Sequence, residues 1–361
     1  MNHNLQQLRA LGQSLWLDNI TRAMLDDGSF ARKIDEYGLT GLTSNPSIFD
    51  EALAKSDSYD AGIRAKAAAG LEGEALFTEL ALEDLRRAAE LFRPAFEASH
   101  GTDGWVSMEL SPLLAGDTAG SVAAAQQIHA QAACENLFVK IPGTPAGVPA
   151  IEESIFNGVP INVTLLFSAE QYLAAAEAYL RGIERRLQAG RSPRVPSVAS
   201  LFVSRWDKAV ADQVPAELRN RLGIAVAQKT YRAYRELLDS ERWRGLQAEG
   251  ALPQRLLWAS TSTKDPDAPD TLYAAALAAP DTIDTLPDKT LAAFAEHGEV
   301  ASVLDGDDGS AMLREFARAG VDVDALATRL QEEGAQAFVK SWHHLLEGIA
   351  AKTAALREAR G

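Results

Sequence analysis

Lys140 is the residue whose surroundings point most directly to chemistry. It lies in Leu137–Pro142, a short apolar run that predicts a buried β-strand. Side chains alternate between the two faces of a strand, so Lys140 shares a face with Phe138 while Val139 points the other way. Burial lowers the pKa of a lysine, and the neutral amine can attack a carbonyl carbon to form a Schiff base. The alternative is a lysine that reaches water from the strand end or pairs with a carboxylate.

Other candidate residues follow the ends of further predicted strands. Two are carboxylates, Asp18 on the face of Trp16 and Glu109 on the face of Ser107. The remaining candidates are Asn45, Asn162, Thr164, Ser200, Phe202, Arg205, Ser260 and Lys264. Each polar group also has a structural explanation, such as a helix cap, a turn before proline or a surface ion pair. Polar residues at the ends of so many predicted strands favour an active site at the C-terminal end of a barrel, because a barrel interior stabilised by packing alone would contain Val, Ile and Leu.

Strands alternate with helices along the whole chain. Apolar runs predict strands at 14–18, 38–44, 104–110, 137–141, 160–166, 197–203, 255–260 and 281–286. Helical spacing covers 3–11, 19–36, 59–100, 119–134, 147–156, 169–189, 206–239 and 270–278, with a turn at 305–309 and further helices beyond it. This alternation favours an α/β fold, a closed (β/α)8 TIM barrel with additional N- and C-terminal helices. The alternative, an open doubly wound sheet, usually has a Gly-x-Gly-x-x-Gly turn that is absent here.

We expect one domain over residues 1–361, with the barrel core at about 14–300 and a C-terminal helical extension at about 310–361. The net charge of −15 disfavours binding to nucleic acids and anionic membranes. No run of about 20 apolar residues predicts a membrane span. The single cysteine, Cys134, permits no intrachain disulfide, and we expect a cytoplasmic protein.

Two competing chemistries have weak support in the sequence. Six scattered histidines and one cysteine form no metal-ligand pattern, so we expect no metal and no other cofactor. Lys340 is a rival nucleophile with apolar neighbours, but its helical spacing lets the ammonium group reach water.

Six motifs together resemble the transaldolase family. They are Trp-Leu-Asp (16–18), Leu-Thr-Ser-Asn-Pro-Ser-Ile-Phe (42–49), Leu-Phe-Val-Lys-Ile-Pro-Gly-Thr (137–144), Ile-Asn-Val-Thr-Leu-Leu-Phe-Ser (161–168), Ser-Leu-Phe-Val-Ser-Arg (200–205) and Trp-Ala-Ser-Thr-Ser-Thr-Lys (258–264). They follow one another in the family's order, and the resemblance covers about residues 10–350. The spacing is most similar to the long bacterial branch of the family.

The resemblance implies transfer of a dihydroxyacetone unit from sedoheptulose 7-phosphate to glyceraldehyde 3-phosphate. The products would be erythrose 4-phosphate and fructose 6-phosphate, as in the non-oxidative pentose phosphate pathway. It further implies Lys140 as the Schiff-base nucleophile, Glu109 as a proton shuttle through a water near Thr164, and Asp18 as the base for carbon–carbon cleavage. Asn45 would hold substrate hydroxyls, together with the asparagine of the fifth strand, Asn162.

One position departs from the family pattern. The short branch binds the sugar phosphate with an arginine two residues after a serine of the seventh strand, whereas here Ser260 is followed by Ser262. We therefore expect Lys264 to bind the phosphate with Arg205 and Ser260. Two alternatives remain: a fructose 6-phosphate aldolase, disfavoured by Glu109 and by the chain length, and a non-catalytic binding protein on the same fold. The expected partners are small sugar phosphates, and the expected state is a monomer or homodimer.

Overall fold

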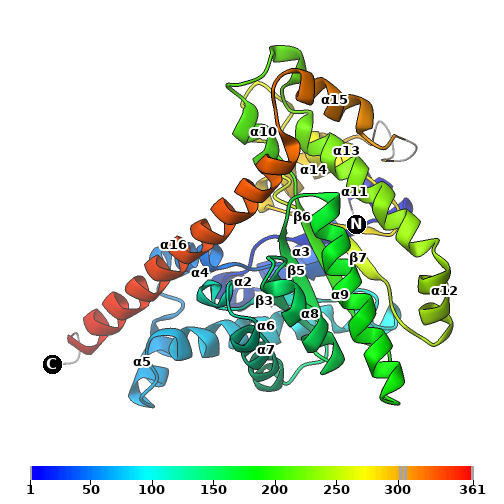
Figure 1. Ribbon diagram of the computed structural model, residues 1–361. Coiled ribbons are helices and arrows are strands. Elements are labelled where there is room, and N and C mark those ends of the chain that lie inside the picture. Colours follow the sequence, from blue (N-terminus) through cyan, green and yellow to red (C-terminus); the bar gives the residue numbers. More distant parts are fainter. Residues whose placement is uncertain (1, 301–303, 305–306, 359–361) are drawn as a thin grey trace.

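Eight parallel strands surrounded by helices form the framework of the molecule (Figure 1). The computed structural model describes residues 2–300, 304 and 307–358. The strands are β1 (Ser14–Leu17), β2 (Gly41–Leu42), β3 (Val106–Glu109), β4 (Leu137–Pro142), β5 (Ile161–Leu166), β6 (Ser197–Phe202), β7 (Gln254–Ala259) and β8 (Thr282–Leu286). Their order is β2-β1-β8-β7-β6-β5-β4-β3, and a bridge from Gly41 to Trp105 nearly closes the sheet. The predicted (β/α)8 barrel is confirmed.

Helices follow the strands and cover the barrel. They are α1 (His3–Ala10), α2 (Arg22–Asp26), α3 (Ser29–Tyr37), α4 (Pro46–Lys55), α5 (Asp60–Ala68), α6 (Gly73–Ala98), α7 (Thr118–Ala132), α8 (Gly147–Phe156), α9 (Ala169–Gln188), α10 (Ser204–Val210), α11 (Leu222–Leu238), α12 (Glu241–Ala248), α13 (Leu272–Ala276), α14 (Asp288–His297), α15 (Ser310–Arg318) and α16 (Val323–Glu358). The helix predicted over 206–239 is divided into α10 and α11, and α4 and α12 have no predicted counterpart. The predicted turn at 305–309 lies partly outside the described residues.

The prediction is least accurate around β2. A strand is predicted over 38–44, yet β2 has only two residues and α4 begins at Pro46. Gly38 ends α3 with φ +67°, and the Asn45 side chain accepts a hydrogen bond from the Ile48 N–H at 3.2 Å as the N-cap of α4. Helix caps therefore occupy both ends of the predicted strand. Proline is favourable at the first position of a helix because its missing N–H would have no helical partner there.

Three aromatic rings fill the barrel interior below its C-terminal rim. Trp105 and Phe138 stack with ring centroids 4.0 Å apart, and Trp16 lies 6.3 Å from Phe138. Gly41 is required beside them, because a Cβ there would lie 2.5 Å from the Trp16 ring. Lys140 lies two residues after Phe138 on the same face of β4, directly above this aromatic layer. Side chains at that level therefore meet solvent only through the C-terminal rim.

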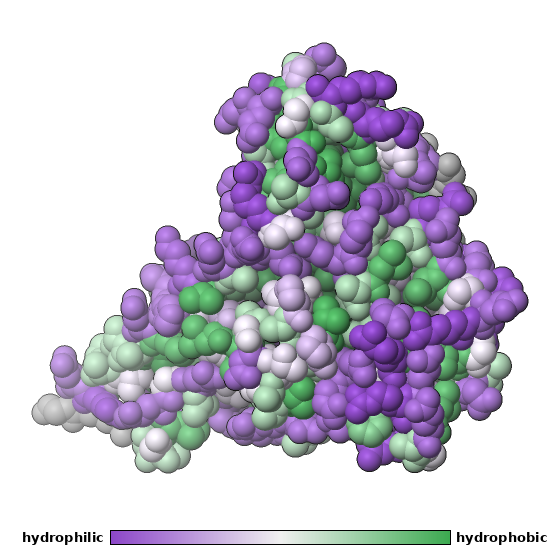
Figure 2. All heavy atoms as spheres, viewed as in Figure 1, coloured by the Kyte–Doolittle hydropathy of each residue, from purple (hydrophilic) through white to green (hydrophobic). Residues whose placement is uncertain are grey.

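A second, larger apolar cluster separates the strands from the surrounding helices. Outward-facing side chains such as Leu15, Val139 and Val163 belong to it. Figure 2 shows polar residues over most of the face in view, with apolar residues in scattered groups between them. In the part of the chain that the structure describes, no helix is long and apolar enough to cross a membrane.

Asp284 is a buried carboxyl on the outward face of β8. In register it pairs with Leu15 of β1 and Trp258 of β7, both buried. Its side chain is inaccessible to solvent, and neither carboxyl oxygen accepts a hydrogen bond of normal geometry from the described residues. Burial raises the pKa of Asp284 from its ordinary value near 4 to about 8. Asp284 is therefore protonated in the folded protein at neutral pH.

The titration of Asp284 predicts how stability depends on pH. Between about pH 4 and pH 8 the unfolded carboxyl has lost its proton while the folded one retains it, so raising the pH favours unfolding. Asp284→Asn removes this titration. The free energy of unfolding of the variant minus that of wild type should therefore be several kcal/mol larger near pH 8 than near pH 5, since one pKa unit corresponds to about 1.4 kcal/mol. Urea denaturation at both pH values measures this. Asp35→Asn, exposed on α3, is the control, and equal effects of the two substitutions would contradict the assignment.

Candidate active site

Lys140 and Glu109 form a buried pair at the C-terminal end of the barrel interior. They occupy adjacent register positions on β4 and β3, and only 5% and 7% of their surfaces are exposed. Lys140 Nζ donates hydrogen bonds to Glu109 Oε2 and to the carbonyl oxygen of Ser44, both at 3.1 Å. Burial raises the pKa of Glu109, and the neighbouring Lys140 charge offsets part of this increase. Glu109 is therefore placed to exchange a proton with the lysine nitrogen.

Asp18, which follows β1, is held by a short chain of hydroxyl groups. Thr43 Oγ1 donates to Asp18 Oδ1 at 2.8 Å and lies 2.7 Å from Thr285 Oγ1. The single hydroxyl proton of Thr43 goes to the carboxylate, so Thr285 must donate to Thr43. Burial raises the pKa of Asp18, whereas the Thr43 hydrogen bond and the charges of Lys140 and Lys264 partly lower it. The two carboxylates thus have different partners.

A cavity of about 240 Å³ connects most of the predicted site residues. Those that line it are Asp18, Asn45, Lys140, Thr164, Ser200, Phe202, Arg205, Ser260 and Lys264. Glu109 and Asn162 do not line it, but each contacts a residue that does. The lining residues that the sequence did not predict include Thr43, Thr285 and Phe338. Alternation along β8 could have identified Thr285, whereas no local signal marks Phe338, which comes from α16.

Two inward-facing polar side chains of β5 differ in their hydrogen bonding. Asn162 is fully buried, accepts a hydrogen bond from Ser200 Oγ at 2.7 Å, and donates to Ser107 Oγ at 3.1 Å. In this structure it therefore positions Ser200. The Thr164 hydroxyl lines the cavity and is also buried, but it has no hydrogen-bond partner among the described residues. A buried hydroxyl without a partner is unfavourable, so a water or a ligand hydroxyl in the cavity is its natural partner.

Cations gather at one side of this cavity. The guanidinium of Arg205 lies 5.2 Å from the centroid of the Phe202 ring, and in the described chain no carboxylate lies within 4.0 Å of Arg205 or Lys264. Partial burial and the charges of Lys208 and Arg205 lower the pKa of Lys264. Ser260 has φ +55°, and its hydroxyl lies 2.9 Å from the hydroxyl of Ser204, the first residue of α10. Two cations beside serine hydroxyls suit a phosphate group.

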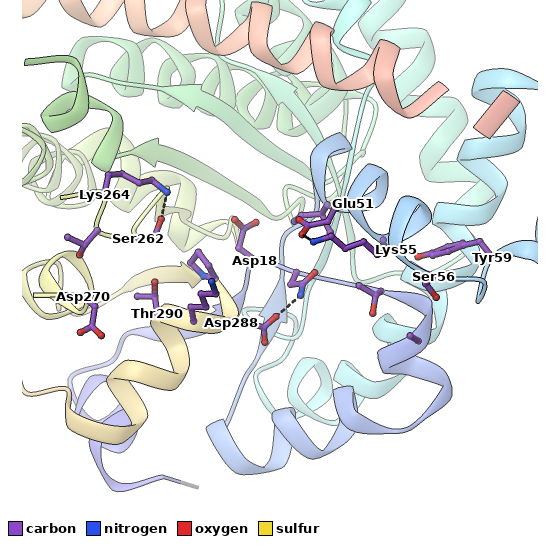
Figure 3. Close-up of a pocket in the computed structure, with 18 residues that line it drawn as sticks. Asp18, Glu51, Lys55, Ser56, Tyr59, Ser262, Lys264, Asp270, Asp288 and Thr290 are labelled. Carbon is purple, nitrogen blue, oxygen red and sulfur yellow. Dashed lines mark hydrogen bonds and ion pairs between the residues drawn. The ribbon is translucent and has the colours of Figure 1, made fainter. Parts of the chain in front are cut away.

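A wider outer cavity of about 810 Å³ adjoins the inner one, and the two share Asp18, Ser262 and Lys264. In Figure 3, Asp18 lies between Lys264 and Ser262 on one side and Glu51 and Lys55 on the other. Lys264 Nζ donates to Ser262 Oγ at 2.5 Å, which directs the ammonium group along the cavity wall. The outer cavity gives a substrate a route to Asp18 and the inner cavity.

A buried lysine that donates a hydrogen bond to a carboxyl of raised pKa, with a second carboxylate in the same cavity, fits an enzyme that forms a Schiff base with a carbonyl substrate. The model of the Transaldolase/Fructose-6-phosphate aldolase family matches residues 15–349. The chain is 45% identical to the transaldolase of Thiobacillus denitrificans over 349 residues, which cover 94% of this chain and 97% of that protein.

Two further relatives agree. The chain is 42% identical to the transaldolase of Thermobifida fusca over 366 aligned positions, which cover 98% of this chain and all of that protein. It is 41% identical to the transaldolase of Mycobacterium tuberculosis over 362 positions, which cover 96% of each chain. The chain therefore belongs to the transaldolase/fructose-6-phosphate aldolase family, as the sequence motifs predict.

The hydrogen bond from Thr43 to Asp18 generates a prediction about the pH profile. Thr43→Val removes a donor that stabilises the ionised carboxylate, so the pKa of Asp18 should rise further. If Asp18 acts as a base, the acidic limb of the activity profile should move to higher pH. At pH values below the pKa that sets this limb, the reaction rate should fall about tenfold. Thr43→Ser, which keeps the hydroxyl, is the matched control. An acidic limb that stays in place in Thr43→Val would refute the link.

Proposed function

We propose that this chain is a transaldolase that transfers a dihydroxyacetone unit from sedoheptulose 7-phosphate to glyceraldehyde 3-phosphate, giving erythrose 4-phosphate and fructose 6-phosphate. The observation that carries the proposal is the buried Lys140, hydrogen-bonded to Glu109 at the wall of a cavity that also contains Asp18. The relatives described above are all named transaldolase and match over nearly their whole length, which disfavours the fructose 6-phosphate aldolase alternative.

In the first half of the reaction, Lys140 passes a proton to Glu109, and its neutral amine attacks the C2 carbonyl of the ketose phosphate. The carbinolamine that forms must lose water to become an iminium ion, and this step needs a proton on the departing oxygen. Glu109 is 3.1 Å from the lysine nitrogen, and burial raises its pKa, so it is suited to deliver that proton through a water molecule. The unpaired hydroxyl of Thr164 offers such a water a second hydrogen bond.

In the second half, Asp18 removes the proton from the C4 hydroxyl. The C3–C4 bond breaks, the aldose phosphate leaves, and the electron pair remains on Lys140 as an enamine of dihydroxyacetone. The enamine carbon then attacks the aldehyde of the acceptor, and Asp18 returns the proton to the new hydroxyl. The iminium formed in this way adds one water, the carbon–nitrogen bond breaks, and the new ketose phosphate leaves Lys140 as the amine. Asp18 lies in both the inner and the outer cavity, so it can reach the carbon next to the departing aldose.

The remaining side chains hold the substrate in this scheme. Arg205 and Lys264 bind the phosphate with Ser260, while Ser200 and Asn45 bind hydroxyls along the sugar. The carboxamide oxygen of Asn45 caps α4, so its N–H groups are the part that would donate to a sugar oxygen. Sugar phosphates are anions, and these local cations suit them despite the net negative charge of the chain.

A coupled assay tests the reaction itself. With fructose 6-phosphate as donor and erythrose 4-phosphate as acceptor, wild-type protein should form glyceraldehyde 3-phosphate and sedoheptulose 7-phosphate in equal amounts. Free dihydroxyacetone, measured in the same samples, should be a minor product. Release of dihydroxyacetone at the same rate with and without acceptor would favour the aldolase alternative.

Variants that lack Asp18 or Glu109 should be blocked at different steps of the reaction. A positioned acid–base group typically contributes about 10²–10⁴-fold to the rate. Asp18→Ala should still form the Schiff base but stall before cleavage, so borohydride should trap an intact hexose phosphate on Lys140. Glu109→Ala should slow trapping itself. Mass spectrometry of reduced adducts over time separates the cases, and a predominant three-carbon adduct in Asp18→Ala would show that Asp18 has another function.

The assignment of Lys264 to the phosphate predicts a change in binding. Lys264→Ala should raise the KM for fructose 6-phosphate about tenfold, because it removes a charge-assisted contact of about 1.5–3 kcal/mol. Activity with unphosphorylated fructose should be unaffected. Lys340→Ala is the matched control, since Lys340 is an exposed cation of α16 that lines neither cavity. Equal losses with the two donors would place Lys264 outside the phosphate site.

A further inference from the structure

The long helix α16 crosses the barrel at the end where the inner cavity opens. It begins after α15, contacts β5 and the turn at Pro112–Leu114, and continues to α4 and α5 near the C-terminus (Figure 1). Apolar side chains of its first half, such as Leu326 and Leu330, belong to the same cluster as Phe202 of the cavity wall. This half of α16 is therefore part of the apolar surroundings of the site.

Gln331 fixes α16 to the two strands that carry Lys140 and Thr164. Its side chain is 7% exposed, and Nε2 donates to the carbonyl oxygens of Gly143 at 3.0 Å and Leu165 at 2.9 Å. Leu165 has φ +58° and lies where the register of β5 shifts, so its carbonyl cannot follow the regular strand pattern. The helix thus holds the ends of β4 and β5 by a side chain rather than by sheet pairing.

Gly334 lets α16 approach the site closely. A Cβ at this position would lie 2.9 Å from the Leu165 side chain and 3.4 Å from the guanidinium of Arg205. Gln331, Gly334 and Phe338 are spaced by three and four residues, so they lie on one face of the helix. The face that contacts the strand ends therefore continues directly to Phe338.

Phe338 is the part of α16 that lines the inner cavity together with Asp18 and Lys140. Its side chain is buried, with 8% of the residue exposed. Among the described residues that line the cavity, Phe338 is the one from α16, and the polar groups come from the strands, their loops, α4 and α10. An aromatic ring at this place offers no hydrogen bond to a sugar and limits the room for water.

We propose that Phe338 is a residue that determines the outcome of the reaction: it excludes water from the enamine on Lys140 and so favours transfer over release. The inference rests on the proposed function and concerns the step after carbon–carbon cleavage. The enamine carbon has two fates, attack on the acceptor aldehyde or capture of a proton from water. In the second fate the resulting iminium adds one water, the carbon–nitrogen bond breaks, and free dihydroxyacetone leaves Lys140 as the amine.

Hydrolysis of an iminium ends both fates, but protonation of the enamine carbon by water occurs only in release and competes with the acceptor. A wider, wetter cavity should therefore raise the rate of release more than the rate of transfer. A Phe338 that only stabilised the fold would lower both rates together. The ratio of the two rates therefore separates water exclusion from packing.

The test compares Phe338→Ala with wild type, using fructose 6-phosphate as donor. Release is measured as free dihydroxyacetone without acceptor, and transfer as sedoheptulose 7-phosphate formed with erythrose 4-phosphate. The ratio of release to transfer should rise about tenfold, which corresponds to about 1.4 kcal/mol between the two barriers. Phe338→Leu, which keeps most of the apolar volume, should change the ratio much less. Phe338→Val, which removes more volume, should raise the ratio by an intermediate factor and replaces the alanine variant if that variant folds poorly.

Leu345→Ala is the matched control, because Leu345 is a buried apolar residue of α16 that does not line the cavity. It should leave the ratio unchanged. An unchanged ratio in Phe338→Ala, or an equal increase in Leu345→Ala, would overturn the proposal. Borohydride trapping of Lys140 in each variant shows that Schiff-base chemistry persists. A wild-type protein that forms neither adduct nor transfer product would instead overturn the proposed function, and the inference about Phe338 with it.

Discussion

The hydrogen bond between Lys140 Nζ and Glu109 Oε2 is the interaction on which the rest of the structure depends. Both groups are almost free of solvent, and removing one partner of such a pair costs roughly 3–5 kcal/mol because the other charge stays buried. The pair exists only because β3 and β4 align these two residues in register. The barrel must therefore be closed and correctly registered before the site exists at all.

The two carboxylates of the site, Glu109 and Asp18, have different surroundings and therefore different chemistry. Below Lys140 and Glu109, Phe138 and two tryptophans close the barrel interior, so a substrate reaches the lysine nitrogen from the side of the cavity. Glu109 is paired with the amine, whereas Asp18 is held by the hydroxyl of Thr43 and lies where the outer cavity begins. Two carboxylates in distinct environments can act at different steps of one reaction. The site therefore separates Schiff-base formation from carbon–carbon cleavage by position within the barrel.

The barrel and the inward positions of Lys140, Glu109 and Thr164 could be predicted from the sequence, because strand alternation is a local property and apolar runs report it directly. Side chains that meet through the fold could not. Thr285 approaches Thr43 from β8, and Phe338 reaches the cavity from α16, and the local sequence predicts neither of these contacts. The strand predicted at 38–44 is longer than β2, because Gly38 ends α3 at one side and Asn45 caps α4 at the other. The geometry of these helix caps sets the ends of β2, and a hydrophobic pattern does not predict it.

The central claim is that Lys140 is the amine that becomes covalently bound to substrate. Borohydride reduction of the wild-type protein with fructose 6-phosphate, followed by proteolysis and mass spectrometry of the peptides, tests it most directly. The account predicts one stoichiometric adduct, located on the peptide that contains Lys140, and no adduct in Lys140→Ala. An adduct on another lysine, such as Lys340 on the exposed side of α16, or no adduct at all, would contradict it.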